Sequence, residues 1–312
     1  MVNIQKCAII GCGFVGATTA FTLIEHGVFS ELVLIDANNK KAEGEAMDLN
    51  HGIPFAKPVK VYAGNYDDLS DCSLIIISAG ANQKPGETRI DLVKKNTAIL
   101  KSIIPEIIRR NKECILLILS NPVDILTYIT LKISGFPKNR VIGSGTVLDT
   151  ARLKYLLAEH LSVDSRNVHA FIIGEHGDSE LAVWSSANIS GIDLKDFCGL
   201  CGKCTSMENI YNLYNNVRES AYKIIDSKGA TYYAIAMATL RIVECIVRDE
   251  KSVIPVSTLV EGEYGINDVC MGLPSIVGKN GVERILEIPL NKNEAENLLN
   301  SAREINEYTR LN

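Results

Sequence analysis

The residue best suited to acid–base chemistry in this chain is a histidine between acidic and glycine neighbours. His176 lies in the segment GEHGDSE, directly after an apolar run, and the segment LDTAR contains Asp149 and Arg152 at a predicted helix start. A histidine oriented by a carboxylate can give and take a proton near neutral pH. The planar guanidinium of an arginine suits a substrate carboxylate. These residues predict proton transfer on a small carboxylic acid.

Structural roles remain open for the same residue types. A lone histidine is more often structural, and we expect that role for His26, His51 and His160. Arg152 could be a helix-surface cation, or it could form a local ion pair with Asp149, three residues earlier. The flanks of His176 and its carboxylate partner favour catalysis.

A dinucleotide motif opens the chain. Gly11, Gly13 and Gly16 follow a predicted strand and begin a predicted helix. Such glycines allow a tight turn and a close approach of the backbone to a pyrophosphate. Asp36 ends the next strand, where it would accept hydrogen bonds from ribose hydroxyls and repel a 2′-phosphate. No cation follows it in 37–39. The motif therefore predicts NAD, against the alternative of a glycine-rich turn that binds nothing.

The elements around this motif alternate between strands and helices up to residue 143. Apolar runs predict strands at 6–10, 31–36, 74–78, 114–120 and 140–143, and helices are predicted at 16–27, 40–49 and 92–111, with Pro105 as a candidate kink. Near-continuous apolar runs are typical of parallel strands covered on both faces. We predict an α/β fold with a doubly wound parallel (Rossmann) sheet in an NAD-binding domain, residues 1–143.

The pattern changes after Gly145. We predict helices at 147–160, 207–227, 230–248 and 293–308, a strand at 168–173, and strand-like runs at 252–259 and 269–277. This mixture predicts a C-terminal α+β substrate domain, residues 144–312.

Composition narrows the function classes. The net charge of −5 provides no basic surface for nucleic acid. No apolar run reaches the ~18 residues that a membrane helix needs, so we expect a cytoplasmic protein whose nine cysteines are reduced thiols. Cys198, Cys201 and Cys204 have metal-ligand spacing, but a fourth cysteine and a nearby histidine are missing. We therefore favour free thiols and predict no metal.

The motifs GCGFVG, LIDANNKKAEGEAMDLNHG, SAGANQKPGETRIDL, SNPVD, GSGTVLDTARL, IIGEHGDSE and KGATYYAIA occur in this order. With its motifs in this order, the sequence resembles the bacterial L-lactate dehydrogenase family over nearly the whole chain. Several of these motifs are specific to the lactate/malate dehydrogenase superfamily, and ANQKPGETR favours the lactate branch. The resemblance implies reversible hydride transfer between NADH and pyruvate to give L-lactate, in a homotetramer.

The resemblance also implies a role for each motif residue. His176 would give and take the proton of the substrate oxygen, Asp149 would hold its imidazole, and Arg89 would polarise the carbonyl from a lid loop. The implied substrate-binding residues are Arg152, Gln83, Asn121, which would bond the reacting oxygen, and Thr231. The implied cofactor-binding residues are Gly11, Gly13, Phe14, Val15, Gly16, Asp36, Gly80, Ala81, Asn121 and Ile235, which would pack against the nicotinamide.

The predicted lid spans 80–88, between a buried strand and a long helix. It contains two glycines and Pro85, which suits a mobile segment that excludes water; an ordinary surface loop is the alternative. Gln83 in this segment argues against malate, because malate enzymes of the superfamily carry a cation there. A malate or other L-2-hydroxyacid dehydrogenase is the nearest alternative, and a non-catalytic NAD-binding protein is a more distant one.

Regulation is a further expectation from the resemblance. Many bacterial members bind fructose 1,6-bisphosphate at a subunit interface, through an arginine and a histidine. Lys154 and His169 occupy these positions, so the histidine matches and the arginine is replaced. Lysine keeps the charge but loses the two-pronged hydrogen bonding of a guanidinium. The alternative is a solvated helix lysine and a strand histidine without function.

Overall fold

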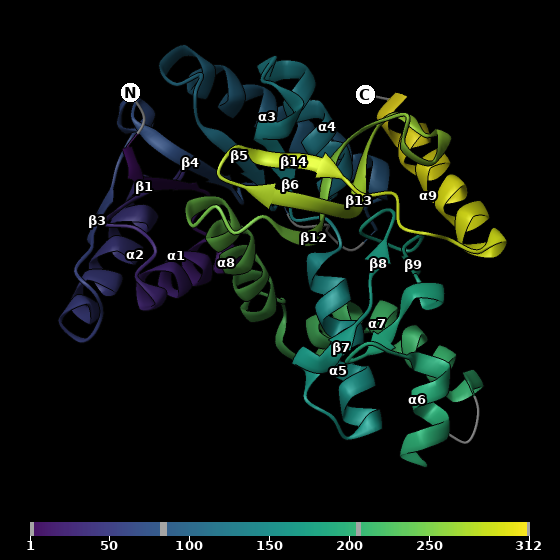
Figure 1. Cartoon of the computed structure of the whole chain (residues 1–312). Coiled ribbons are helices and arrows are strands. Elements are labelled where there is room, and N and C mark those ends of the chain that lie inside the picture. The colour runs from purple at the N-terminus through teal and green to yellow at the C-terminus, as the bar shows by residue number, and fades with distance from the viewer. Residues whose placement is uncertain (1–2, 82–85, 204–206, 311–312) are drawn as a thin grey trace.

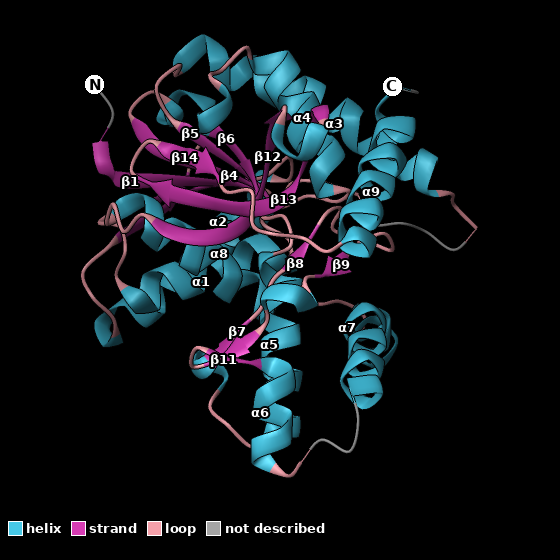
Figure 2. Cartoon of the chain, turned by 45° about the vertical axis from the view of Figure 1, so that its right-hand side comes forward, coloured by secondary structure: helices cyan, strands magenta, loops and turns pink. Residues whose placement is uncertain are grey.

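The computed structural model describes residues 3–81, 86–203 and 207–310. A large central sheet carries helices on both faces, and a mainly helical lobe built around α5 (Val147–Leu161), α6 (Leu194–Cys201) and α7 (Met207–Lys228) extends from one side of it (Figures 1 and 2). The two parts meet near β8 (Ile172–Ile173), which is where the predicted acid–base residues lie.

The remaining elements follow the predicted alternation. The other helices are α1 (Phe14–His26), α2 (Asn39–Gly52), α3 (Arg89–Arg110), α4 (Val123–Ser134), α8 (Tyr233–Val247) and α9 (Lys292–Arg310). The strands of the large sheet are β1 (Asn3–Ile10), β2 (Glu31–Ile35), β3 (Lys60–Ala63), β4 (Cys72–Ile77), β5 (Ile115–Ile118), β6 (Val141–Gly143), β12 (Ser252–Glu261), β13 (Asn267–Gly278) and β14 (Gly281–Ile285). The short strands of the lobe are β7 (Val168–His169), β9 (Leu181–Ala182), β10 (Asn188–Ile189) and β11 (Ile192–Asp193).

The large sheet confirms the doubly wound prediction and extends it. Its order is β14-β13-β12-β6-β5-β4-β1-β2-β3, and the strands from β3 to β6 are parallel. The C-terminal strands join this sheet in antiparallel orientation, because Ser257 of β12 pairs with Gly143 of β6. The sheet thus continues across the predicted boundary at residue 143, and the division into 1–143 and 144–312 stays a prediction.

Alternate residues of β1 show why its sequence is apolar throughout. Cys7 and Ile9 pack into the core under α1, α2 and α8, while Ala8 and Ile10 pack into the core under α3 and α4. Successive strand side chains point to opposite faces, so a strand buried on both faces needs apolar residues at every position. This packing fixes the sheet edge at which the functional loops emerge.

The structure differs from the predicted elements in several places, and β3, β14 and α6 are among the elements that were not predicted. The single strand expected at 168–173 is two strands, because His169 pairs with Asn188 in one sheet while Ile172 pairs with Ala182 in another. The helix expected at 92–111 begins at Arg89, since Thr88 caps it through the backbone N–H of Asp91, and it continues through Pro105. Helix α4 was not predicted, because it is largely buried and its sequence lacks a regular polar face.

Two further findings concern sequence-based expectations. Within the described ranges, no helix is both long and apolar enough to cross a membrane. Cys198 is disulfide-bonded, so the expectation of a reduced thiol is wrong there: that expectation rested on compartment, which says nothing about local cysteine geometry. Cys201 is a free thiol, and Cys204 lies outside the described residues.

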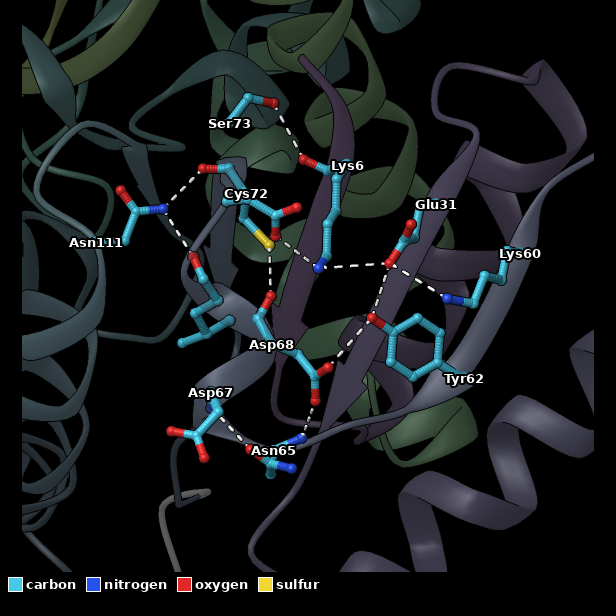
Figure 3. A network of polar contacts seen from close by, with 12 residues as sticks. Lys6, Glu31, Lys60, Tyr62, Asn65, Asp67, Asp68, Cys72, Ser73 and Asn111 are labelled. Carbon is cyan, nitrogen blue, oxygen red and sulfur yellow. Dashed lines mark hydrogen bonds and ion pairs between the residues drawn. The ribbon is translucent and has the colours of Figure 1, made fainter. Parts of the chain in front are cut away.

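A polar network joins the amino-terminal parts of β1, β2 and β4 (Figure 3). The buried Lys6 ammonium lies 2.7 Å from Asp71 and 3.4 Å from Glu31, and Tyr62 donates a hydrogen bond to Glu31. Burial alone lowers the pKa of Lys6, but its hydrogen bond to Asp71 and neighbouring charges raise it above its usual value. A buried ammonium needs such partners. The network pins the strand ends opposite those that carry the glycine motif.

Candidate active site

The predicted cofactor residues meet at the carboxyl edge of the parallel sheet. Gly11 follows β1, Asp36 follows β2, Gly80 and Ala81 follow β4, and Asn121 follows β5. The strand order reverses between β1 and β4, and this switch point is where doubly wound sheets bind ligands.

The glycine loop leaves room for a phosphate group. A Cβ at Gly11, where φ is +101°, would collide with the backbone of Ala79, and one at Gly16 would collide with the Gly11 carbonyl oxygen. A Cβ at Gly13 would meet no atom within 4 Å. Gly13 caps α1 without a side-chain hydrogen bond, so the first N–H groups of the helix are available to an anion. The loop therefore fits a dinucleotide pyrophosphate.

Asp36 is held in place at the end of β2. Its carboxylate accepts the backbone N–H of Cys12 at 2.7 Å and that of Asn38 at 2.9 Å. Each carboxylate oxygen has a further lone pair, so Asp36 can still accept bonds from ribose hydroxyls.

A buried asparagine that the sequence analysis missed links the next two loops. The side chain of Asn96, on α3, accepts the N–H of Ala81 at 2.7 Å and donates to the carbonyl oxygen of Asn121 at 2.7 Å. Asn96 interrupts the buried apolar face of α3, and a polar residue in such a stripe was the available signal. The Asn121 side chain itself is exposed.

The predicted acid–base pair is formed. His176, in the loop between β8 and β9, places Nδ1 2.5 Å from a carboxylate oxygen of Asp149 in the first turn of α5. Asp149 is 2% exposed, and its other oxygen accepts a hydrogen bond from Arg152 at 2.8 Å. The local ion pair considered above for Arg152 therefore exists. It occupies one of five N–H donors of the guanidinium, which leaves donors for a substrate carboxylate.

A second buried carboxylate holds the histidine backbone. Asp124, at the start of α4, accepts the N–H of His176 at 2.7 Å and the hydroxyl of Ser257 at 2.6 Å. Burial raises the pKa of Asp124, although both hydrogen bonds oppose the shift. The sequence analysis quoted Asp124 within SNPVD without a role. Its partners are 52 and 133 residues away in the chain, so local spacing could not identify them.

The electrostatics of the pair favour a charged imidazole. Burial alone lowers the pKa of His176, but the charge of Asp149 and the hydrogen bond to it raise the pKa to about 9. For Asp149, burial raises the pKa, while His176 and Arg152 together bring it below its usual value. The pair is therefore set to hold a proton on the histidine near neutral pH.

Arg89 lies close to the pair but faces a different partner. It is the first residue of α3, forms an ion pair with the buried Glu175, and lies 4.8 Å from the ring centre of Tyr308. Glu175 directly precedes His176, so Arg89 is held beside the segment that contains His176. Gln83 and Pro85 of the predicted lid lie outside the described residues.

Thr231 and Ile235 lie where α7 leads into α8. Both are half-buried, and Ile235 packs against the core that contains α1. The adjacent Tyr232 stacks on Phe14, with ring centres 5.3 Å apart. This stack brings the predicted nicotinamide-side residues next to the first turn of the glycine-motif helix, where Val15 also packs.

The two predicted effector residues lie in the helical lobe. Lys154 is a half-buried residue of α5, and burial lowers the pKa of its ammonium. His169 is an exposed residue of β7. Lys154 has no ion pair within the described ranges.

A glycine loop that fits a dinucleotide, together with a histidine–aspartate pair and an arginine in the same chain, defines an NAD-dependent dehydrogenase. The family model "lactate/malate dehydrogenase, NAD binding domain" matches residues 5–143, and the model "lactate/malate dehydrogenase, alpha/beta C-terminal domain" matches residues 146–310. The chain therefore belongs to the lactate/malate dehydrogenase family.

Individual relatives narrow the comparison. The chain is 58% identical to the L-lactate dehydrogenase of Acetivibrio thermocellus, covering 97% of this chain and 96% of the relative. It is 56% identical to L-lactate dehydrogenase 1 of Clostridium acetobutylicum, with the same coverage. Among solved structures, the minor L-lactate dehydrogenase of Enterococcus mundtii superposes with a TM-score of 0.95 at 44% identity, covering 98% of each chain. A lactate dehydrogenase from a deep-sea metagenome library gives 0.96 at 45% identity, covering 99% of each.

We predict that Asp36 sets the cofactor preference. Replacing Asp36 with serine removes the charge that repels a 2′-phosphate, so the ratio of the NADPH to the NADH dissociation constant should fall by about tenfold or more. Fluorescence titration with each cofactor measures this ratio, and Asn39→Ser, at the first residue of α2, is the matched control. Equal wild-type dissociation constants for the two cofactors would contradict the role of Asp36.

Proposed function

We propose that this chain transfers hydride reversibly between NADH and pyruvate to give L-lactate, with His176 as the proton donor and acceptor. Its activity is that of an NAD-dependent L-lactate dehydrogenase, as its full-length relatives are named. The observation that carries the assignment of residues is the contact of His176 with the buried Asp149, beside Arg152.

The residues divide the chemistry between them. Bound NADH supplies the hydride that reaches the keto carbon of pyruvate. His176 gives its proton to the carbonyl oxygen, and it takes the proton back when lactate is oxidised. Asp149 stabilises the charged imidazole and fixes its orientation. Arg152 pairs with the substrate carboxylate, which would otherwise be an unpaired charge out of water.

Two assignments depend on residues around this centre. We propose that Arg89 polarises the substrate carbonyl, supported by its position next to the segment that contains His176. We propose that Asn121 bonds the reacting oxygen, supported by the Asn96 contacts that fix its backbone. Thr231 would then line the substrate pocket from the loop between α7 and α8.

The alternative functions are less well supported. A malate or other L-2-hydroxyacid dehydrogenase would use the same His176, Asp149 and Arg152, but the relatives quoted above are named as lactate enzymes. A non-catalytic NAD-binding protein has no need for a buried acid–base pair at the edge of its cofactor site.

The pH dependence of pyruvate reduction tests the role of His176. Pyruvate reduction needs the protonated imidazole, whose pKa is raised to about 9. The kcat/KM for pyruvate should therefore be level below that pH and fall about tenfold per unit above it, while lactate oxidation should rise with pH over the same range. Steady-state NADH oxidation measures both profiles. His176→Asn should abolish turnover and keep NADH binding; near-normal turnover in this variant would contradict the role.

Gln83 tests the choice of substrate. A neutral amide tolerates the methyl group of pyruvate but leaves the second carboxylate of oxaloacetate unpaired. Gln83→Arg should therefore shift the kcat/KM ratio toward oxaloacetate by orders of magnitude. A panel of 2-oxo acids measures the ratio for both proteins. A wild-type preference for oxaloacetate over pyruvate would show that the chain is not a lactate enzyme.

We also propose that the chain assembles as a homotetramer and acts in the cytoplasm. Large apolar side chains lie exposed on several helices, which supports burial against further copies. They include Phe21, Met47, Tyr155, Tyr233 and Met237. A substrate set of NADH and pyruvate supports the cytoplasmic assignment.

We propose activation by fructose 1,6-bisphosphate only because Lys154 and His169 occupy the effector-binding positions described above. A bound phosphate should favour protonated His169, so activation should be stronger below neutral pH. It should lower the KM for pyruvate by stabilising an assembly in which the pocket is formed.

Pyruvate saturation curves test this proposal at two pH values, with and without millimolar fructose 1,6-bisphosphate. Lys154→Ala and His169→Ala should each abolish the effect and keep the basal activity. Superimposable wild-type curves at both pH values would show that the chain is not regulated in this way.

A further inference from the structure

A third carboxylate lies beside the His176–Asp149 pair. Glu180 follows His176 by four residues and is 8% exposed. An oxygen of Glu180, an oxygen of Asp149 and a ring nitrogen of His176 all lie within 4.8 Å of one another. One Glu180 oxygen, Oε1, has no hydrogen-bonding partner in the part of the chain that is described. A buried carboxylate without a partner is costly, and none of the roles above uses it.

Contacts with helix α7 hold the backbone of the loop that carries this carboxylate. The hydroxyl of Tyr214 donates to the backbone carbonyl of Glu180 at 2.5 Å, and Arg218 donates to the carbonyl of Asp178 at 2.6 Å. Helix α7 packs against α5, which carries Asp149 (Figure 2). The loop backbone is therefore held on this side, and the Glu180 side chain is buried there.

Charges from four elements act on the pair and on Glu180. Positive groups are provided by α5 and α7, and negative groups by α4, α5 and the loop itself. They are Arg152 and Asp149 on α5, Arg218 on α7 with the Tyr214 phenol, Asp124 on α4, and His176 and Glu180 in the loop. Asp124 is in turn influenced by Arg89 on α3. Of the buried acids Asp124, Asp149 and Glu180, Glu180 is the one with an oxygen that accepts no hydrogen bond from the described residues.

We propose that Glu180 is a positioning residue whose charge keeps His176 protonated at alkaline pH, without contacting the substrate. This inference rests on the proposed role of His176 as the proton donor. Glu180 would thereby extend the pH range over which the enzyme reduces pyruvate.

The order of ionisation supports this role. Burial raises the pKa of Glu180 to about 8, and the charge of Asp149 adds to the shift, against the opposing effects of His176, Arg152 and Arg218. His176 has a pKa of about 9, to which Glu180 contributes. Between these two values Glu180 is negative while His176 is still positive, and an opposite charge at this separation favours the imidazolium. Below the lower value Glu180 is neutral and has little effect.

Glu180→Gln separates a charge effect from a structural one. At about pH 7 the variant should match the wild type within about twofold in kcat/KM for pyruvate, because Glu180 is protonated there. The alkaline fall should begin about one pH unit lower, so that near pH 9 the variant is about tenfold less active. The NADH dissociation constant should not change. The shift should appear in kcat/KM for lactate oxidation as an earlier rise.

Two further variants make the test decisive. Glu180→Asp keeps the charge and should keep the wild-type profile. Glu219→Gln makes the same substitution on an exposed residue of α7, paired with Lys223, and should change nothing. A wild-type profile in Glu180→Gln would overturn the proposal, and so would an equal loss at every pH, which indicates a structural role.

If Glu180→Gln does not fold, Glu180→Asp decides: a downward shift of its alkaline limb would overturn the proposal. A wild-type protein that fails to reduce pyruvate would instead contradict the proposed function, so the two failures are distinguishable.

Discussion

The contact between His176 and the buried Asp149 is the interaction on which the rest of the site depends. A carboxylate that is 2% exposed is tolerated only because His176 and Arg152 neutralise it. The same contact keeps the imidazole charged and oriented. Removing either partner would leave the other with an unsatisfied polar group out of water, so the proposed acid–base function and local stability rest on the same atoms.

The site needs both halves of the chain. Helix α5 provides Asp149, but the backbone of His176 is held by Asp124, which follows β5, and Asp124 is held by Ser257 of β12. Because β12 pairs with β6 at the edge of the parallel sheet, the loop that contains His176 is tied to the same sheet as the glycine loop. This arrangement ties a histidine of the C-terminal half to the sheet that carries the glycine motif.

Three buried carboxylates near one histidine have different pKa values because their partners differ. Asp149 has two cationic partners, which bring its pKa down despite burial. Asp124 has a hydroxyl and a backbone N–H, which do not offset burial, so its pKa is raised. Glu180 has an unpartnered oxygen, and burial raises its pKa to about 8. The surroundings of each acid, rather than its residue type, therefore determine its pKa and the role it can take.

The sequence alone determined the features that depend on near neighbours: the glycine motif, Asp36 at a strand end, the apolar runs of the parallel sheet, and the helix start that carries Asp149 and Arg152. It also predicted the His176–Asp149 pair, because the segments GEHGDSE and LDTAR that contain these residues are recognisable motifs. Only the tertiary structure decided the roles of Asn96, Asp124 and Glu180, and the joining of β12 to β6. Those contacts link residues far apart in the chain or depend on burial, and neither local periodicity nor spacing encodes which distant group will satisfy a buried polar atom.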